Sequence, residues 1–207
     1  MSKTVCLAFT GASGMPYGLR LLECLLETGC RVQLLYSQVA QVVAKQEIGL
    51  DLPSRASEAQ TYFRARYAAL PGTLDAFGRD EWFAPVASGS NPPDAMVVCP
   101  CTMGTLAAIA QGLASNLLER AADVVLKEGR KLVLVPRETP FSALHLENML
   151  RLARCGAVIL PPNPGFYHHP QRVEDLVDFV VARILDQLAI PHALMRRWGE
   201  ADERDRG

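Results

Sequence analysis

Short runs of almost entirely apolar residues recur along the chain and alternate with longer segments that have a helical pattern. In the first such segment, Leu19, Leu22 and Leu26 fall on one face of a helix, while Arg20 and Glu23 face away from it. Continuously apolar runs are typical of strands that are covered on both faces, as in a parallel sheet. The runs are TVCLAF, RVQLLYS, DAMVVCP, KLVLVP and AVILPP. Their alternation with helices predicts a doubly wound α/β fold, in which helices cover both faces of a mainly parallel sheet.

Residues 51–93 interrupt this alternation. They contain one predicted helix around SEAQTYFRARYAAL, followed by PGTLDAFGRDEW and ASGSNPPD, which are rich in turn-forming residues. The segment has too little apolar sequence for a core of its own. We therefore expect one domain over residues 1–190 with an irregular insertion around 51–93, and a C-terminal tail over residues 191–207.

The composition narrows the classes of function. Hydrophobic residues make up 49% and charged residues 21% of the 207 residues, and the formal net charge is −1. Such a charge gives no support for binding to nucleic acid or to an anionic membrane surface. No apolar run is long enough to span a bilayer, and the N-terminal residues lead directly into a predicted strand, unlike a signal peptide.

The six cysteines do not form a recognisable metal or redox motif. Cys99 and Cys101 are separated by one residue, which is not the spacing of a CxxC pair. Several cysteines lie within apolar segments, so we expect buried free thiols and a reducing compartment, the cytoplasm. The four histidines lie far from the cysteines in sequence, and no metal site is expected.

The loop TGASGMPYG joins the first predicted strand to the first predicted helix. Its glycines, Gly11, Gly14 and Gly18, match neither the dinucleotide fingerprint nor a Walker loop. A strand end and a helix N-terminus nevertheless direct backbone N–H groups towards an anion, and Ser13 adds a hydroxyl. From this loop alone, phosphate binding and a tight turn without a ligand are equally good interpretations.

Two further positions favour a mononucleotide. The second strand ends in Tyr36-Ser37, without the acidic residue that holds the ribose of NAD. Ser37 is expected to bind a phosphate or ribityl chain, to cap the next helix, or both. A second loop after the DAMVV strand offers small and hydroxyl-bearing residues at another helix start, namely Thr102, Met103, Gly104 and Thr105. Two such loops at the carboxyl ends of neighbouring strands predict a phosphate crevice.

Charged residues supply candidate chemistry. Arg137 and Glu138 directly follow a buried strand, at the sheet edge where ligands of this fold bind, and a carboxyl group there could exchange protons with a phosphate or substrate. Arg120 and Lys127 are seven residues apart and share one face of a helix. That face is either a solvent-exposed stripe or a cationic wall for a second anion, and Arg183 on the last helix raises the same question.

Taken together, these residues resemble the flavin prenyltransferases of the UbiX family. The resemblance covers about residues 4–200 and rests on five blocks in the same order: TGASG with YG, PCTMGTLAAIAQG, NLLERAADVVLKE, LVLVPRETPFSALHLENM and PGFYHHP. It implies a flavodoxin-like, three-layer αβα subunit that assembles into a dodecamer. It also implies transfer of a dimethylallyl group from dimethylallyl phosphate to N5 and C6 of reduced FMN, without a metal. The product, prenylated FMN, would serve a UbiD-type decarboxylase in ubiquinone biosynthesis or aromatic acid metabolism.

The resemblance also assigns roles to residues at matching motif positions. FMN-binding positions are matched by Gly11, Ala12, Ser13, Ser37, Thr102, Met103, Gly104, Thr105 and Arg137. Positions around the prenyl donor are matched by Tyr167, Arg183, Arg120, Lys127, Trp82 and Trp198, the last in a tail expected to lie partly over the active site. Catalytic positions are matched by Glu138, with help from Ser13 and Lys127, and by Glu47, which is expected to act during ring closure.

Two other functions fit parts of the sequence. An FMN-dependent decarboxylase of cysteine-like substrates shares this fold. Its family has a motif similar to PASANT, whereas this chain has Pro100-Cys101-Thr102-Met103-Gly104-Thr105 at that place, without the asparagine. That family also needs a catalytic histidine near the second helix, and the segment SQVAQVVAKQE contains none. A flavin carrier would explain the two loops but not the set of Arg120, Lys127, Tyr167 and Arg183.

Overall fold

A central parallel sheet organises the computed structural model, which describes residues 2–195. Within these residues the sheet has six strands in the order β3-β2-β1-β4-β5-β6, and every neighbouring pair is parallel. The strands are β1 (Thr4–Phe9), β2 (Arg31–Tyr36), β3 (Thr73–Ala76), β4 (Ala95–Cys101), β5 (Lys131–Pro136) and β6 (Val158–Ile159). The predicted doubly wound α/β fold is confirmed.

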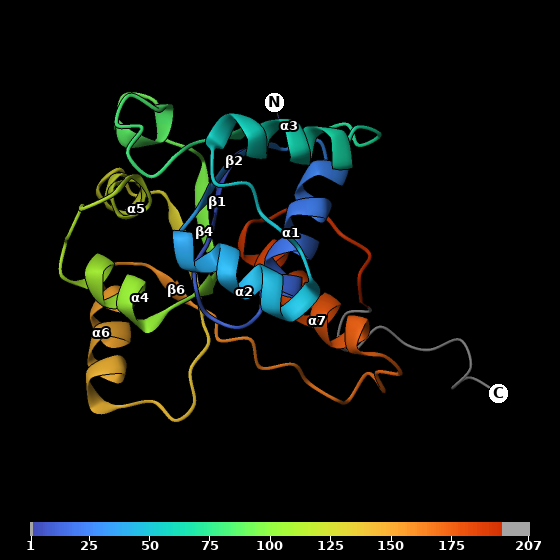
Figure 1. Ribbon diagram of the computed structural model, residues 1–207. Helices are drawn as coiled ribbons and strands as arrows, with labels where there is room; N and C mark the ends of the chain where they lie inside the picture. The colour runs from blue at the N-terminus through green and yellow to red at the C-terminus, as the bar shows by residue number, and fades with distance from the viewer. Residues whose placement is uncertain (1, 196–207) are drawn as a thin grey trace.

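Helices cover both faces of the sheet (Figure 1). One face packs against α1 (Met15–Glu27), α2 (Gln38–Ile48), α3 (Ala56–Arg66) and α7 (Val173–Gln187). The other packs against α4 (Met103–Ala110), α5 (Leu117–Lys127), α6 (Ala143–Arg154) and the short 3₁₀ helix η1 (Pro85–Ala87). No helix within residues 2–195 combines the length and apolar character needed to cross a bilayer.

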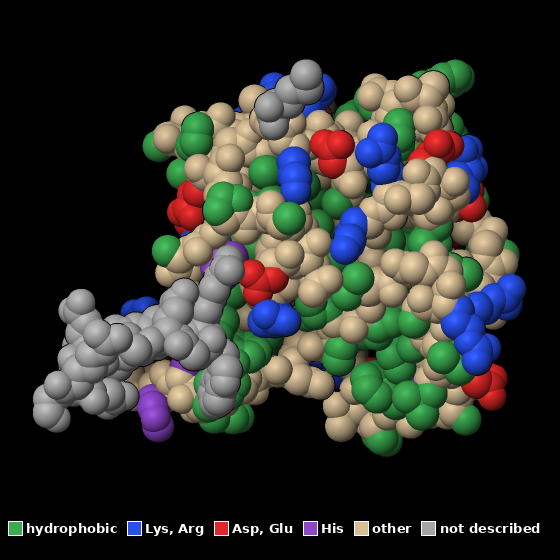
Figure 2. All heavy atoms as spheres, turned by 180° about the vertical axis from the view of Figure 1, so that it is seen from behind, with side chains coloured by type: hydrophobic (Ala, Val, Ile, Leu, Met, Phe, Trp, Pro, Cys, Tyr) green, Lys and Arg blue, Asp and Glu red, His purple; other side chains and the backbone are tan. Residues whose placement is uncertain are grey.

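The outer face of α6 carries exposed apolar side chains. Leu144, Leu146 and Leu150 retain 70%, 54% and 51% of their accessible surface, and Phe141 before the helix retains 37%. Hydrophobic side chains are also seen gathered at the lower right of the space-filling view, on the side of the molecule where α6 lies (Figure 2). Such a group is typical of a surface that contacts another protein.

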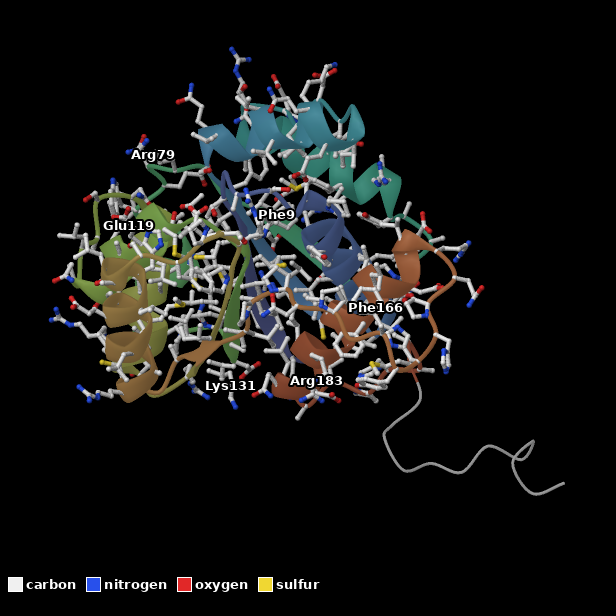
Figure 3. All side chains as sticks on the ribbon, turned by 90° about the horizontal axis from the view of Figure 1, so that it is seen from below. Phe9, Arg79, Glu119, Lys131, Phe166 and Arg183 are labelled. Carbon is white, nitrogen blue, oxygen red and sulfur yellow. The ribbon has the colours of Figure 1, made fainter. Side chains whose placement is uncertain are left out.

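The core explains why the strands read as apolar throughout. Val5, Leu7 and Phe9 of β1 pack towards α1 and α7, and Cys6 and Ala8 pack towards α4 and α5, all at 0% exposure. Phe9 lies near the centre of the molecule (Figure 3). All six cysteines are free thiols, and all except Cys155 are buried, in line with the sequence prediction.

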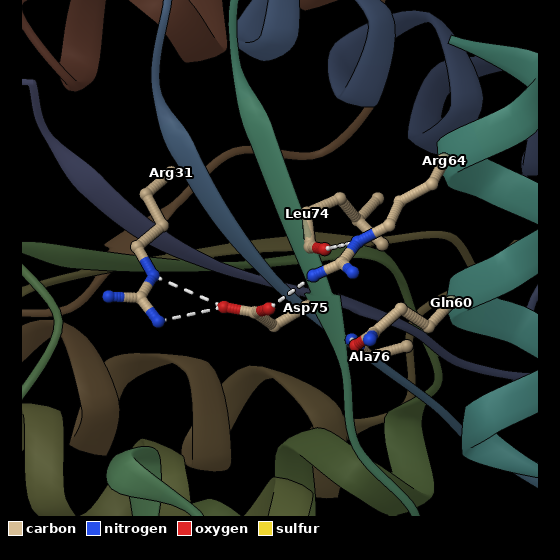
Figure 4. A network of polar contacts seen from close by, with 6 residues as sticks. All are labelled: Arg31, Gln60, Arg64, Leu74, Asp75 and Ala76. Atoms are coloured by element: carbon tan, nitrogen blue, oxygen red, sulfur yellow. Dashed lines mark hydrogen bonds and ion pairs between the residues drawn. The ribbon is translucent and has the colours of Figure 1, made fainter. Parts of the chain in front are cut away.

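The sequence analysis predicted one helix and turn-rich segments in residues 51–93, but the structure also has an edge strand there. Within this segment β3 pairs with β2, and Asp75 accepts hydrogen bonds from Arg31 and Arg64, each at 2.8 Å (Figure 4). Gln60 of α3 accepts a further hydrogen bond from the backbone N–H of Ala76 at 3.1 Å. A strand of four residues that contains an aspartate has too little apolar character to be recognised by pattern.

The last predicted strand, AVILPP, is shorter than expected. β6 comprises only Val158 and Ile159, although the N–H of Leu160 still donates to the carbonyl of Leu134 at 2.8 Å. Pro161 and Pro162 have no N–H with which to continue the ladder, so the pairing stops there.

Candidate active site

The loops that leave β1, β2, β4 and β5 meet at the carboxyl edge of the sheet. In the strand order, β1 lies between β2 and β4, where successive strands are added on opposite sides. This is the position at which open α/β sheets leave a crevice for a ligand. The N–H of Ser37 donates to Phe9, and that of Arg137 donates to Cys101, so the strand ends are directly adjacent.

Thr10 joins the first loop to the loop after β4. Its side chain is buried, and its hydroxyl donates to the carbonyl of Pro100 at 2.8 Å while accepting from the N–H of Thr102 at 2.8 Å. The next residue, Gly11, lies so close to α2 that a Cβ would fall 2.3 Å from Val39. The floor of the crevice is therefore fixed by the buried hydroxyl of Thr10 and by the close packing of the Gly11 backbone against Val39.

The N-terminus of α1 already holds a carboxylate from the same chain. Glu47, in the last turn of α2, accepts hydrogen bonds from the N–H of Gly14 at 3.0 and 3.1 Å and from the N–H of Met15 at 2.8 Å. These are the backbone groups that an anion would use at this helix start. Ser13, one residue earlier, is exposed.

Ser37 and Thr102 both cap helices. Ser37 accepts from the N–H of Ala40 at the start of α2, and Thr102 accepts from the N–H of Thr105 at the start of α4. The capping role predicted for Ser37 is confirmed. Ser37 and Thr105 also line a cavity of about 100 Å³, so the two predicted loops share one space.

Arg137 and Glu138 line a second cavity, of about 340 Å³, at the end of β5. Its other walls come from Phe141 at the entry to α6 and from Pro161 and Asn163 after β6. The carboxylate of Glu138 accepts a hydrogen bond from the N–H of Thr139 at 3.1 Å. The arrangement places a guanidinium-bearing and a carboxyl-bearing residue in one pocket at the expected sheet edge.

Tyr167 and Arg183 lie along α7, on the side of the sheet that α1 covers. The ring of Tyr167 contacts that of Phe179 edge-on, with centroids 5.9 Å apart. Arg183 follows Phe179 by four residues, so the two lie on one face of the helix. Arg183 is exposed and donates to Asp186 at 2.8 Å.

Arg120 and Lys127 lie on α5, on the opposite side of the sheet from α7. Arg120 donates to the carbonyl of Ala87 at 3.0 Å and to Asp123 at 2.7 Å. Lys127 is the last residue of α5, shortly before β5 begins, and it pairs with Glu128 at 2.5 Å. It therefore lies towards the amino edge of the sheet, away from Arg137.

The two tryptophans lie in different parts of the chain. Trp82 lies in the β3–β4 connection and keeps 44% of its accessible surface, next to a fully exposed Phe83. Trp198 lies outside the described residues. A single chain thus brings together, at the carboxyl edge of the sheet, the residues predicted to bind FMN. The cations predicted to bind the prenyl donor, and Trp82, lie on other parts of its surface.

The family-model match and the relatives agree with one another. A protein-family model described as Flavoprotein matches residues 1–185. The flavin prenyltransferase UbiX of Pseudomonas aeruginosa is 57% identical over 196 residues, covering 95% of this chain and 94% of that protein. The chain belongs to the UbiX flavin prenyltransferase family.

Solved structures support this assignment. A UbiX (PadA1) structure in complex with FMN and dimethylallyl pyrophosphate is 38% identical, with a TM-score of 0.86 over 98% of this chain and 100% of that one. A dodecameric FMN-dependent UbiX-like decarboxylase from Escherichia coli O157:H7 is 43% identical, with a TM-score of 0.82 over 94% of this chain and 98% of that one.

The carboxyl edge of this UbiX-family protein fits FMN. Two hydroxyl-bearing residues, Ser37 and Thr105, line one cavity. The backbone at Gly104 is open, because a Cβ there would meet nothing closer than Thr102 Oγ1 at 3.9 Å. Within residues 2–195, no group of three or more histidine, cysteine, aspartate and glutamate side chains could hold a metal ion.

Three features of this prenyltransferase-family site escaped the sequence analysis. Thr10 was not singled out, although a threonine directly after a buried strand and before a glycine loop was a usable signal. The contact between Glu47 and the start of α1 joins residues 33 positions apart and has no local signal. Arg79 lines the cavity of Ser37 and Thr105 from a loop that was read only as turn-rich.

Proposed function

We propose that this protein transfers the dimethylallyl group of dimethylallyl phosphate to N5 and C6 of reduced FMN, forming prenylated FMN without a metal. The observation that carries the proposal is the similarity to the UbiX (PadA1) structure holding FMN and dimethylallyl pyrophosphate, which extends over 98% of this chain. That structure was solved with the pyrophosphate, so the choice of the monophosphate is part of the proposal.

The residues at the carboxyl edge hold the flavin in this proposal. FMN, when bound, supplies the electron-rich ring atoms that accept the prenyl group. Backbone and side-chain groups of the two loops orient it there, and Arg137 contributes a positive charge. The residues are Gly11, Ala12, Ser13, Ser37, Thr102, Met103, Gly104, Thr105 and Arg137.

The donor-side residues act on the leaving phosphate. An allylic phosphate ionises more easily when fixed cations and a proton donor match the charge that develops on the departing anion. Arg120, Lys127, Tyr167 and Arg183 bind that phosphate, and Glu138 delivers the proton, assisted by Ser13. Aromatic faces stabilise the allyl cation, and exclusion of water protects it.

Trp82 and Trp198 supply those aromatic faces beside the prenyl group. Glu47 acts in the later, ring-closing stage. Its contact with the start of α1 fixes the end of α2 against the first loop, which would keep its carboxylate at a defined position. The tail that carries Trp198 lies partly over the site in this proposal.

A homo-oligomer completes the site. Arg120 and Lys127 lie on α5, on the other side of the sheet from Arg183, so no single chain gathers them around one phosphate. Neighbouring subunits would supply the missing cations, and the exposed leucines of α6 offer a contact surface. The dodecameric assembly of the similar Escherichia coli protein supports a dodecamer here.

The product would pass to a UbiD-type decarboxylase in ubiquinone biosynthesis or aromatic acid metabolism. We infer a cytoplasmic location, because the six free thiols suit a reducing compartment. The chain's net charge gives no support for a nucleic-acid or membrane partner. The relatives do not favour the alternatives of a decarboxylase or a flavin carrier.

The decisive experiment is anaerobic incubation of the protein with reduced FMN and dimethylallyl phosphate, followed by mass spectrometry of the extracted flavin. We expect a mass gain of one five-carbon prenyl unit. Unmodified flavin, with both ligands shown to bind, would reject the proposal in favour of a carrier. The Lys127→Ala variant should retain FMN and lose transfer.

Sharing of the site between subunits can be tested by mixing two inactive variants. Lys127→Ala and Glu138→Gln chains, unfolded together and refolded, would form assemblies in which about a quarter of the sites have both native residues if the two come from different subunits. Recovery of activity on mixing supports the shared site. Absence of recovery, with mixed assemblies verified by mass, would place both residues in one chain's site.

A further inference from the structure

Arg183 belongs to a row of side chains on one face of α7. Phe179, Arg183 and Asp186 are spaced by four and then three residues, so they are neighbours along the helix surface. The ring of Phe179 contacts that of Tyr167, and the guanidinium of Arg183 donates to the carboxylate of Asp186 at 2.8 Å. The Arg183 side chain is 53% exposed, at the surface of α7 (Figure 3). The row therefore leads from the Tyr167 ring to a half-exposed guanidinium.

Helix stability does not account for the pair of Arg183 and Asp186. Asp186 lies in the last turn of α7, which ends at Gln187, and a carboxylate there is next to the negative end of the helix dipole. In a helix, an ion pair is more favourable when the acidic residue precedes the basic one, and here the order is reversed. Asp186 therefore occupies an unfavourable position that its hydrogen-bond partners must offset.

The second partner of Asp186 within the described residues is His192, which follows the helix. Its Nε2 lies 3.3 Å from Oδ1 of Asp186, whereas Arg183 Nη1 lies 2.8 Å from Oδ2. The N–H of Leu194 donates to the other ring nitrogen, Nδ1, at 3.4 Å. An imidazole that accepts at Nδ1 carries its proton at Nε2, so His192 is a donor to Asp186. The imidazole is only 9% exposed, and its surroundings therefore fix its orientation.

The turn after α7 brings His192 back onto the helix. Ala189 adopts the left-handed conformation, with a φ of 50°. The N–H groups of Ala189 and Ile190 each donate to a carbonyl of the last helical turn at 3.0 Å, which is the pattern of a Schellman motif. Ile190 is buried in the same core that α7 packs against. The backbone next to His192 is therefore held in place on both its polar and its apolar side.

His192 determines how Asp186 can pair with Arg183. A carboxylate with two free oxygens can bind a guanidinium through two parallel N–H···O bonds, which use the fork of paired N–H groups. A phosphate is recognised by the same fork, so a bidentate carboxylate would compete with it. Because His192 engages Oδ1, Asp186 accepts from Arg183 through Oδ2, in a single recorded bond. The other N–H groups of the guanidinium remain available for an anion.

We propose that His192 is a positioning residue for the prenyl donor: by holding Oδ1 of Asp186, it leaves the fork of Arg183 free for the donor's phosphate. The role of Arg183 in binding dimethylallyl phosphate rests on the proposed function. His192 touches neither the donor nor the flavin in this assignment. Its effect passes through Asp186, so it depends on the presence of that carboxylate.

Isothermal titration calorimetry of dimethylallyl phosphate with protein that holds oxidised FMN tests the assignment without turnover. His192→Leu fills a similar volume without a donor and frees an oxygen of Asp186 to take the fork. We expect it to raise the Kd of dimethylallyl phosphate about tenfold, the effect of one hydrogen bond to a charged group. His192→Gln retains a side-chain N–H that can reach Asp186 and should stay close to wild type. The Kd of FMN should be unchanged in both variants.

The double variant His192→Leu, Asp186→Asn separates this role from a purely structural one. Asparagine keeps the size of the side chain but has one oxygen, so it cannot accept from both N–H groups of the fork. The double variant should therefore bind dimethylallyl phosphate more tightly than His192→Leu does. A residue that only stabilised the turn after α7 would give no such recovery. A Kd in the double variant equal to or above that of His192→Leu would overturn the proposal.

Glu174→Gln is the matched control, because it removes a carboxylate in the first turn of α7, at the opposite end of the helix from Asp186. It should leave the Kd of dimethylallyl phosphate unchanged. Wild-type affinity in His192→Leu, with its folding verified by urea denaturation, would also overturn the assignment. Wild-type protein that binds dimethylallyl phosphate without transferring the prenyl group would contradict only the proposed function.

Discussion

The carboxylate of Glu47 caps the N-terminus of α1 by accepting hydrogen bonds from the N–H groups of Gly14 and Met15 at 2.8–3.1 Å. This contact joins the last turn of α2 to the loop that follows β1. The positive end of the α1 dipole, where the first loop would bind a phosphate, is therefore already occupied by a carboxylate of the same chain. Glu47 has a structural effect that can be measured apart from its proposed catalytic one.

Removal of this cap should destabilise the protein without flavin present. We expect Glu47→Ala to lower the free energy of unfolding by about 1 kcal/mol, as for the loss of a helix N-cap. Glu47→Gln retains one carbonyl oxygen as acceptor and should lose less. Urea denaturation of the flavin-free protein measures both.

Glu27→Ala provides the control at the opposite end of α1. Glu27 lies next to the negative end of the helix dipole, so its removal should leave stability unchanged or slightly increased. Equal losses in Glu47→Ala and Glu27→Ala would show that the hydrogen bonds of Glu47 contribute nothing specific.

Thr10 should be essential to the joining of the two flavin loops. In Thr10→Val the partly buried N–H of Thr102 loses its acceptor, which costs about 1 kcal/mol, at the lower end of the range for an unsatisfied buried group. The loop after β4 is then less restrained, and the Kd of FMN should rise. Thr10→Ser keeps the hydroxyl and should stay much closer to wild type in both stability and FMN affinity. Equal behaviour of the two variants would argue against the hydroxyl.

The fold could be predicted because its strands are buried on both faces. The residues of β1 from Val5 to Phe9 have no exposed surface, so their apolar run is unbroken and easy to recognise. β3 is an edge strand of four residues, and its Asp75 is needed for the ion pairs with Arg31 and Arg64. The polar residue that attaches this strand is what conceals it in the sequence.

Only those parts of the candidate site that lie in single loops after recognisable strands could be predicted. Ser37 and the Thr102–Thr105 segment follow apolar strands, and their order fixes their place at one sheet edge. An exposed glutamate at a helix end, such as Glu47, reads as an ordinary surface charge. The spacing of Arg120 and Lys127 defines a helix face but cannot specify what another subunit would place against it.

Two helical glycines should respond to alanine in opposite ways. A Cβ at Gly18 in α1 would lie 2.5 Å from the carbonyl oxygen of Cys99 and 2.8 Å from the ring of Phe9. Gly18→Ala should therefore push α1 away from the sheet and cost about 1–3 kcal/mol. Gly104→Ala in α4 meets open space and should keep or raise stability, because alanine favours the helix. Thermal unfolding of both variants decides this, and similar losses would contradict the packing argument.

Buried thiols should make the protein sensitive to alkali. Burial raises the pKa of Cys6 and of Cys101 from 9.0 to about 12. Between these values the unfolded chain releases a proton that the folded chain keeps, so the unfolded state binds fewer protons and stability falls as the pH rises. Each thiol should contribute a slope of up to about 1.4 kcal/mol per pH unit above pH 9.

Urea denaturation from pH 8 to pH 11 measures that slope, with reductant present to prevent oxidation. A Cys6→Ala, Cys101→Ala double variant has lost two of the buried thiols whose pKa is raised, so its profile should be flatter than that of the wild type, whatever its stability at pH 8. Cys155→Ala is the control for removal of a thiol from the surface, because Cys155 is exposed. Identical slopes for the wild type and the double variant would mean that the loss of stability at high pH has another origin. One such group is the phenol of Tyr36, because burial also raises its pKa to about 12.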